Sequence, residues 1–560
     1  MNLRWTAPPA GIVLFAALFS GCIESKRPLK YIGDEPLQYY EEAATKIEYP
    51  YVYHETRDDV QFSGPPQRIR HLRKEDIRDM TLAEAVHIAL TNSPIIRTNS
   101  EFLSPANRLL TSPNAVNNSI YDPAIQETEV FNGIGVAGSR RGLEDALSDF
   151  DAIFSTNMTW RQNERIANNT FQVQGLTPGS TFREETQVFT SRLEKQLANG
   201  GILALVHNWN FTSNNAPDST RLFGSFYDGL IQAEYRQPLW AGSGTEYTRI
   251  AGPIGRLRGN VSGVNRGVMI ARIGQDISLA DFELSVRNLV RDVEELYWDL
   301  SLAYRTYHSE VIARNSANKI WLNIKARLGI GGLAEAEEAQ AAESYWDAKA
   351  RAADALAQVY DVEGRLRRLL NLPVSDGTVI RPVDEPVSAE FLPDWYLSLA
   401  EALTRRTELR RQKWQIKSFE LQLKAARSLL KPRLDFVSNY RVNGFGHQLL
   451  GGGDGPQGVR TGYGTISQGD QTGWDLGFEF SMPLGFRQAN AQVRNIELRL
   501  VKARVALELQ EHEISHELAD AFRNLDRWYG NTLDYHNRRL AAGRRVAALE
   551  VLIKLRPELV

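Results

Sequence analysis

The chain has 560 residues, enough for several domains or for one extended architecture. Its formal net charge is −3 at pH 7, so bulk charge gives it no general attraction to nucleic acid or to an anionic membrane surface. Hydrophobic residues make up 42% of the chain and charged residues 24%, which is ordinary for a folded protein. The single cysteine excludes an internal disulfide. No apolar run reaches the length of about 18 residues that marks a membrane-spanning helix.

The N-terminus, residues 1–22, resembles the signal peptide of bacterial lipoproteins. Arg4 supplies a modest positive charge, and residues 11–19 form an apolar core that is too short to span a membrane. Cys22 follows two small residues, at the place where lipoproteins carry their acylated cysteine. The resemblance implies a lipid anchor at Cys22 and, because Ile23 rather than aspartate comes next, residence in the outer membrane. A plain secretory signal with an incidental cysteine is the alternative.

Five segments alternate apolar and polar residues with a period of two, which predicts β-strands between an apolar and a polar environment. They are residues 152–160, 202–211, 230–239, 433–442 and 474–482, and a weaker sixth strand is predicted around 186–197. Tryptophans lie toward several strand ends, as expected of an outward apolar band with aromatic girdles around a wet interior; they are Trp160, Trp209, Trp240 and Trp474. A soluble sandwich with one solvated face is the alternative. Two or three strands per half of the chain cannot close a barrel, so closure requires several chains.

The polar rows of these strands supply candidate residues for a channel lumen. They are Gln232, Glu234, Arg236, Arg433, Asp435 and Glu479. Because both signs of charge occur among them, no ion preference follows.

Three segments are predicted to form helices far longer than the usual ~11 residues. Residues 268–327 contain no proline and repeat apolar residues at steps of three, four and seven, which is one helical stripe. A glycine-rich turn at 329–332 interrupts this rod, and an alanine-rich return helix is predicted from Leu333 to about Leu370. A third long helix is predicted from Arg487 to about Leu552.

An internal duplication orders these elements. The segment Thr81-Leu82-Ala83-Glu84-Ala85-Val86 is echoed by Ser398-Leu399-Ala400-Glu401-Ala402-Leu403, and the strand-ending turn Gln237-Pro238-Leu239 is echoed by Met482-Pro483-Leu484. The predicted organisation is a proline-punctuated tether over 23–75, a first repeat over 76–371 and a second over 395–560.

This ordered set of motifs, over about residues 75–560, resembles the TolC-type outer-membrane efflux proteins. The resemblance implies an α+β membrane protein, in which long antiparallel helical hairpins form a periplasmic α-barrel and the strands join a shared trimeric β-barrel of twelve. It implies a passive conduit for efflux or type I secretion, in the outer membrane and extending into the periplasm. The implied partners are two further copies of the chain, a periplasmic adaptor, an inner-membrane pump and outer-membrane lipid, with no nucleic acid, no cofactor and no enzyme activity.

The hairpin turn is the candidate adaptor contact. Exposed apolar residues beside glycines suit a docking tip, and the candidates are Leu328, Gly329, Ile330, Gly332 and Leu333. The role of an adaptor in this contact is implied by the resemblance alone.

Two departures from the duplication stand out. The first repeat carries an insertion at about 101–200, which enlarges a loop or adds a hairpin, so the count of twelve strands is open. The second repeat is expected to be truncated before its return helix, because the sequence ends before the equivalent of the first hairpin turn.

Two other functions compete with the channel. A periplasmic adaptor or scaffold would also have long helical hairpins, but would not need five alternating strands. A zinc hydrolase is suggested by His512-Glu513-Ile514-Ser515-His516, because histidines four apart share a helix face and can bind zinc. Charged neighbours and the lack of an obvious third ligand favour a solvated helix face instead.

Overall fold

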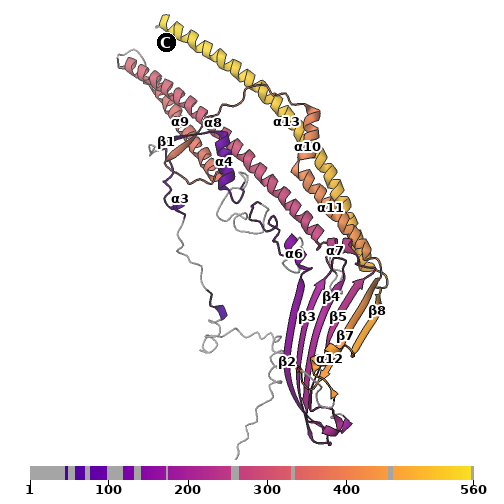
Figure 1. The fold of residues 1–560 in the computed structure, drawn as a ribbon. Helices are drawn as coiled ribbons and strands as arrows, with labels where there is room; N and C mark the ends of the chain where they lie inside the picture. Colours follow the sequence, from indigo (N-terminus) through magenta and orange to yellow (C-terminus); the bar gives the residue numbers. More distant parts are fainter. Residues whose placement is uncertain are drawn as a thin grey trace, which may run out of the picture. The chain divides into compact units, whose positions relative to one another are not determined.

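The computed structural model describes residues 44–47, 57–69, 76–97, 118–130, 141–171, 174–253, 264–329, 335–451 and 458–555. The chain divides into two units, residues 1–63 and 64–560. The described part of the first unit contains the short helix α3 (Asp58–Gln61), and the second contains the sheet and the long helices (Figure 1). The predicted lipidation site Cys22 and the predicted tip residues Ile330, Gly332 and Leu333 lie outside the described residues.

Six strands form one antiparallel sheet in the order β2-β3-β4-β5-β7-β8 (Figure 1). Their bounds are Ala152–Ile166 (β2), Thr181–Gln196 (β3), Ile202–Asn214 (β4), Ser225–Pro238 (β5), Arg433–Gly446 (β7) and Thr472–Ser481 (β8). The five predicted strands and the weaker sixth are all confirmed. The hairpin β2–β3 falls within the insertion predicted at about 101–200, so the insertion adds strands and does more than enlarge a loop.

The long helices also occur where the sequence predicts them. Helix α8 (Val268–Leu328) and helix α9 (Glu335–Leu369) pack along each other, and α13 (Arg487–Leu555) packs on α11 (Thr407–Ser428). Shorter helices are α4 (Leu82–Asn92), α6 (Leu143–Ser148), α7 (Thr245–Ala251), α10 (Trp395–Arg405) and α12 (Gly462–Gln468), with a 3-10 turn at Asp218–Thr220. No described helix has both the length and the apolar character needed to cross a membrane.

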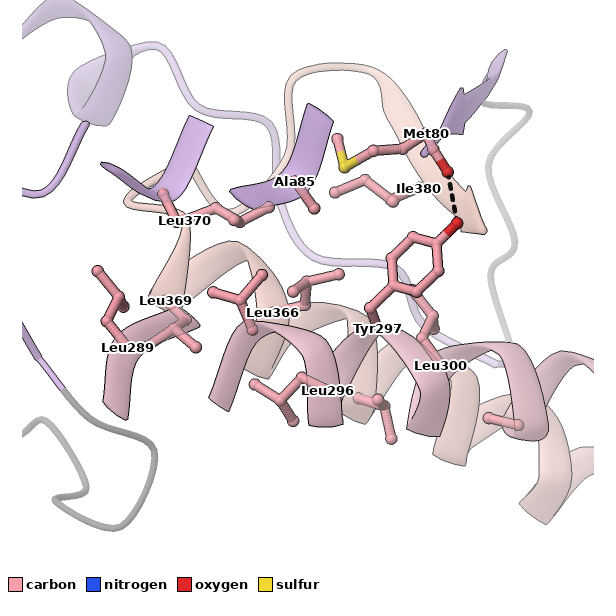
Figure 2. Packing of buried hydrophobic residues seen from close by; sticks show 14 of the residues in the cluster. Met80, Ala85, Leu289, Leu296, Tyr297, Leu300, Leu366, Leu369, Leu370 and Ile380 are labelled. Atoms are coloured by element: carbon pink, nitrogen blue, oxygen red, sulfur yellow. Dashed lines mark hydrogen bonds between the residues drawn. The ribbon is translucent and has the colours of Figure 1, made fainter. Parts of the chain in front are cut away.

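The main core lies where α4 packs on the α8–α9 hairpin (Figure 2). Its α8 members fall on the predicted stripe, since Leu289, Leu296 and Leu300 are all buried. Facing them from α9 is Leu366. A leucine removed from water contributes roughly 1.5–3 kcal/mol, so this region is held by the chain's own apolar side chains.

A small parallel sheet, which the sequence analysis did not predict, covers this core. Strands β1 (Asp76–Met80) and β6 (Thr378–Pro382) pair over five residues although some 300 positions separate them. Beneath them, Arg367 bridges Glu363 at 2.7 Å and Asp376 at 3.1 Å. Burial raises the pKa of the Asp376 carboxyl, but hydrogen bonds from Thr378 and Arg367 outweigh it and lower that pKa to about 2. The start of the first repeat and the segment that follows this repeat are thereby joined to the helical hairpin.

Candidate functional site

The six lumen residues predicted from sequence lie on one face of the sheet. The strand register pairs Pro238 with Asp435 and Asp435 with Glu479, and every second residue along each strand returns to the same face. By this count Gln232, Glu234 and Arg236 of β5 share the face of Arg433, Asp435 and Glu479. This surface is called the polar face below.

Four of these residues, Arg236 among them, form a tight ion-pair group. The Nη1 atom of Arg236 lies 2.7 Å from Asp435 Oδ2, and its Nη2 lies 2.7 Å from Glu479 Oε2. Arg433 reaches the same Asp435 oxygen at 2.8 Å. Asp435 is only 1% exposed, so two guanidinium groups compensate for the burial of its charge. The group links β5, β7 and β8 from one side of the sheet.

A second ion-pair group lies on the polar face of β3 and β5. Arg192 bridges Glu194 at 2.8 Å and Glu234 at 2.9 Å, and the Gln232 amide donates to Glu234 at 2.8 Å. Sequence analysis missed Arg192 and Glu194 as candidates because they belong to the weakly patterned sixth strand. The two residues lie two positions apart on that strand, and this spacing, which places both on one face, would have identified them.

The opposite, apolar face carries large side chains that are open to solvent in a single chain. Phe154 is 66% exposed on β2, and Trp474 and Phe478 are 71% and 67% exposed on β8. The register places Phe154 opposite Leu193, and Leu193 opposite Leu205, so the apolar row continues across neighbouring strands. A continuous apolar surface of this kind marks a face that is covered by another protein or by lipid.

Two predicted girdle residues lie within a strand rather than toward its end: Trp160 in β2, which stays 66% exposed, and Trp209 in β4. Trp209 is only 3% exposed. Its ring lies across Gly229 and Gly444, where an added Cβ would approach the indole to 2.5 Å, and α12 covers it with Tyr463 at a centroid distance of 4.9 Å. The loop between β7 and β8 therefore folds back onto the apolar face, which the sequence pattern of β4 alone does not reveal.

At the predicted adaptor tip, the described part ends with Leu328 and Gly329, which close α8. Close to this end, α8 and α9 carry a group of aromatic rings. Trp321 stacks on Tyr345 at 5.2 Å and donates its indole N–H to Glu338 at 2.6 Å. The two helices are thus held together beside the turn.

His512 and His516 lie exposed on α13. Among the described residues, no group of three or more histidine, cysteine, aspartate or glutamate side chains is placed to hold a metal ion. The zinc hydrolase hypothesis therefore has no supporting geometry in that part of the chain.

Comparison with known proteins matches this architecture to outer-membrane channels. No protein-family model and no curated protein matches the chain. Among solved structures, the outer-membrane channel OprN aligns with a TM-score of 0.51 over 92% of this chain and 89% of that one, at 14% identity. A membrane protein from Pseudomonas aeruginosa aligns with a TM-score of 0.48 (15% identity, 92% and 90% covered), and CusC with 0.48 (12% identity, 90% and 88% covered).

The alignment with OprN shows that this chain shares the fold of that outer-membrane channel, and a fold of this kind is what the sequence motifs predicted.

Proposed function

We propose that this chain is the subunit of an outer-membrane channel that serves as a passive conduit for efflux or type I secretion. The observation that carries the proposal is the division of the sheet into two faces. One face exposes Phe154, Trp474 and Phe478, and the other holds charged side chains in ion pairs. Lipid outside and water inside are the two environments that such a sheet needs.

In this proposal three copies associate so that their polar faces enclose a shared lumen. The lumen is lined by Gln232, Glu234, Arg236, Arg433, Asp435 and Glu479, and the α8–α9 hairpins extend into the periplasm. Since the charges are mutually neutralised in pairs such as Arg236–Asp435, the pore has little net field and admits substrates of either sign. Energy for transport comes from an inner-membrane pump, through an adaptor that contacts Leu328, Gly329, Ile330, Gly332 and Leu333. The fold shared with OprN supports this arrangement.

The proposal includes a lipid anchor at Cys22. The anchor adds to the hold that the apolar face of the sheet provides, because acyl chains buried in lipid contribute further binding free energy. The variant Cys22→Ser is expected to lose incorporation of radiolabelled palmitate while the sheet keeps the protein in the membrane fraction. Unchanged labelling of the variant would refute acylation at Cys22.

The test of the channel is conductance. Protein extracted from outer membranes in detergent and reconstituted into a planar bilayer is expected to give discrete, ohmic current steps without any added energy source. A matched control is protein that has been heat-unfolded before reconstitution, which removes the channel but keeps the detergent and the lipid. A chain that extracts as a water-soluble monomer and gives no steps would refute the proposal.

A further inference from the structure

The two edge strands of the sheet are built for pairing with another chain. Among the residues that the structure describes, strand β2 pairs only with β3 and strand β8 only with β7, so no described strand pairs with the outer edge of either. All 15 residues of β2 are exposed. Neither edge carries a proline or a lysine, which are two of the usual protections of an open edge, although both carry other charged residues. Open edges on both sides of one sheet, with all of β2 exposed, indicate that both are covered in the assembled protein.

The direction of the strands fits pairing between copies. All neighbouring strands in the order β2-β3-β4-β5-β7-β8 are antiparallel. With six strands, β2 and β8 run in opposite directions, so β8 of one copy meets β2 of the next as an antiparallel pair. An odd number of strands would force a parallel seam. The insertion of the β2–β3 hairpin adds two strands and preserves this rule.

The two faces also continue across such a seam. Phe154, Met158 and Trp160 of β2 lie on the same face as Trp474 and Phe478 of β8, as the register carried across the sheet requires. Pairing of β8 with β2 therefore prolongs the apolar band and the polar face together. A second copy of this chain is the partner that presents the matching edge with both faces in the same order.

We infer that β8 of each copy pairs with β2 of the next, so that three copies close a ring of eighteen strands rather than the twelve that the resemblance implies. The number of copies rests on the proposed function, whereas the seam rests on the sheet. With strands about 4.8 Å apart and tilted by about 40°, eighteen strands give a backbone radius of about 18 Å, against about 12 Å for twelve. Barrels of 16–18 strands leave an aqueous channel, so the β2–β3 hairpin widens the outer-membrane pore.

Cysteine cross-linking tests the seam in the full chain. Gly477 of β8 lies on the polar face, and an added Cβ there meets nothing within 4 Å, so Gly477→Cys is sterically free. It is combined in turn with Ser155→Cys, Asn157→Cys or Thr159→Cys on the polar face of β2. Directly opposed residues of an antiparallel pair have Cα atoms about 4.5–5.5 Å apart, which lies within the range of about 4.4–6.8 Å that a disulfide spans. At least one pair is expected to give dimer and trimer bands on non-reducing gels, with the trimer as the largest species.

The matched controls place the second cysteine on β4, an interior strand, as Val206→Cys or Asn208→Cys. Each single-cysteine variant serves as a control for cross-linking through Cys22. Cross-linking of β4 but not β2 to Gly477→Cys would mean that the hairpin is displaced and the ring has twelve strands, which overturns the inference. A β2–β8 link within one chain, seen as a monomer band with altered mobility, would also overturn it.

Bilayer conductance of the same variants separates this inference from the proposed function. Current steps without β2–β8 links would reject the eighteen-stranded ring and leave the channel standing. Trimer bands without current steps would leave the seam standing and reject the conduit.

Discussion

Tyr297 is the residue whose loss tests the helical core most directly. Its side chain is fully buried, and its hydroxyl lies 3.0 Å from the carbonyl oxygen of Met80 (Figure 2). The hydroxyl also lies 2.8 Å from Asp384 Oδ2. The hydroxyl oxygen accepts from the backbone N–H groups of Val383 and Asp384, both at 3.2 Å. One phenol therefore ties α8 to the ends of β1 and β6. Burial raises the pKa of this phenol, so it is protonated at neutral pH.

The substitution Tyr297→Phe keeps the ring and removes the hydroxyl. It takes this acceptor from the Asp384 N–H, while the Val383 N–H keeps the Met80 carbonyl oxygen at 3.2 Å and Asp384 Oδ2 still accepts from Leu82 N–H at 2.6 Å. A polar group left unpaired inside the protein costs about 1–3 kcal/mol. We therefore expect a destabilisation of about 1–3 kcal/mol.

Tyr304→Phe is the matched control. It lies on the same helix, and its hydroxyl makes a single hydrogen bond, to the Ile380 carbonyl oxygen at 3.0 Å. Losing one such bond costs about 1 kcal/mol. Urea unfolding in a fixed detergent, followed by the helical circular dichroism signal, gives the change in unfolding free energy for both variants. The comparison requires that the slope of the unfolding free energy against urea concentration is unchanged. A Tyr297→Phe effect no larger than that of Tyr304→Phe would refute the central role of the Tyr297 hydroxyl.

Three further predictions follow from the same contacts. Leu300→Ala should destabilise the protein by about 2–5 kcal/mol in the same unfolding assay, whereas Leu302→Ala, at a position 64% exposed on the same helix, should change stability by less than about 0.5 kcal/mol. The pKa of Asp376 is about 2 in the folded chain against the ordinary 3.8. The stabilisation from the Asp376 carboxylate is therefore complete above about pH 4 and lost as the pH falls toward 2. The variant Asp376→Asn should make the urea midpoint of unfolding less dependent on pH over that range. Asp435→Asn removes the carboxylate shared by Arg236 and Arg433, so the reversal potential in a KCl gradient should shift toward anion selectivity; an unchanged potential would place this group outside the lumen.

The long helices and most strands could be predicted from sequence, because the spacing of apolar residues that defines each of them lies within one contiguous segment. The stripe through Leu289, Leu296 and Leu300 has the spacing of one helix face, and the structure buries it. Strand ends were less accurate. Strand β2 continues to Ile166, beyond the predicted end at residue 160, because backbone pairing with β3 persists through polar residues. Pairing depends on the partner strand, which the local pattern does not contain.

The small parallel sheet shows a second limit of prediction from sequence. Strand β1 has no alternation of its own and exists because β6 and the Tyr297 hydroxyl hold its end. The duplicated motif has a related limit, since Thr81 caps α4 while Asp394, before the matching Ser398, caps α10. A repeat in the sequence thus preserves the order of elements, but the capping side chain decides where each helix begins.

The helical core and the six-stranded sheet depend on different surroundings for their stability. The helical core buries Leu296, Tyr297 and Leu366 within one chain, so it needs only water outside. The sheet leaves Phe154 and Trp474 uncovered, and the hydrophobic effect stabilises it only when lipid, detergent or another copy covers them. Changing the detergent should therefore alter cross-linking between β2 and β8 far more than it alters the effect of Tyr297→Phe. The insertion added β2 and β3 to the sheet, which is the part of the fold that depends on its surroundings. It therefore increases the apolar surface that must be covered during assembly, and it leaves the helical core of each subunit unchanged.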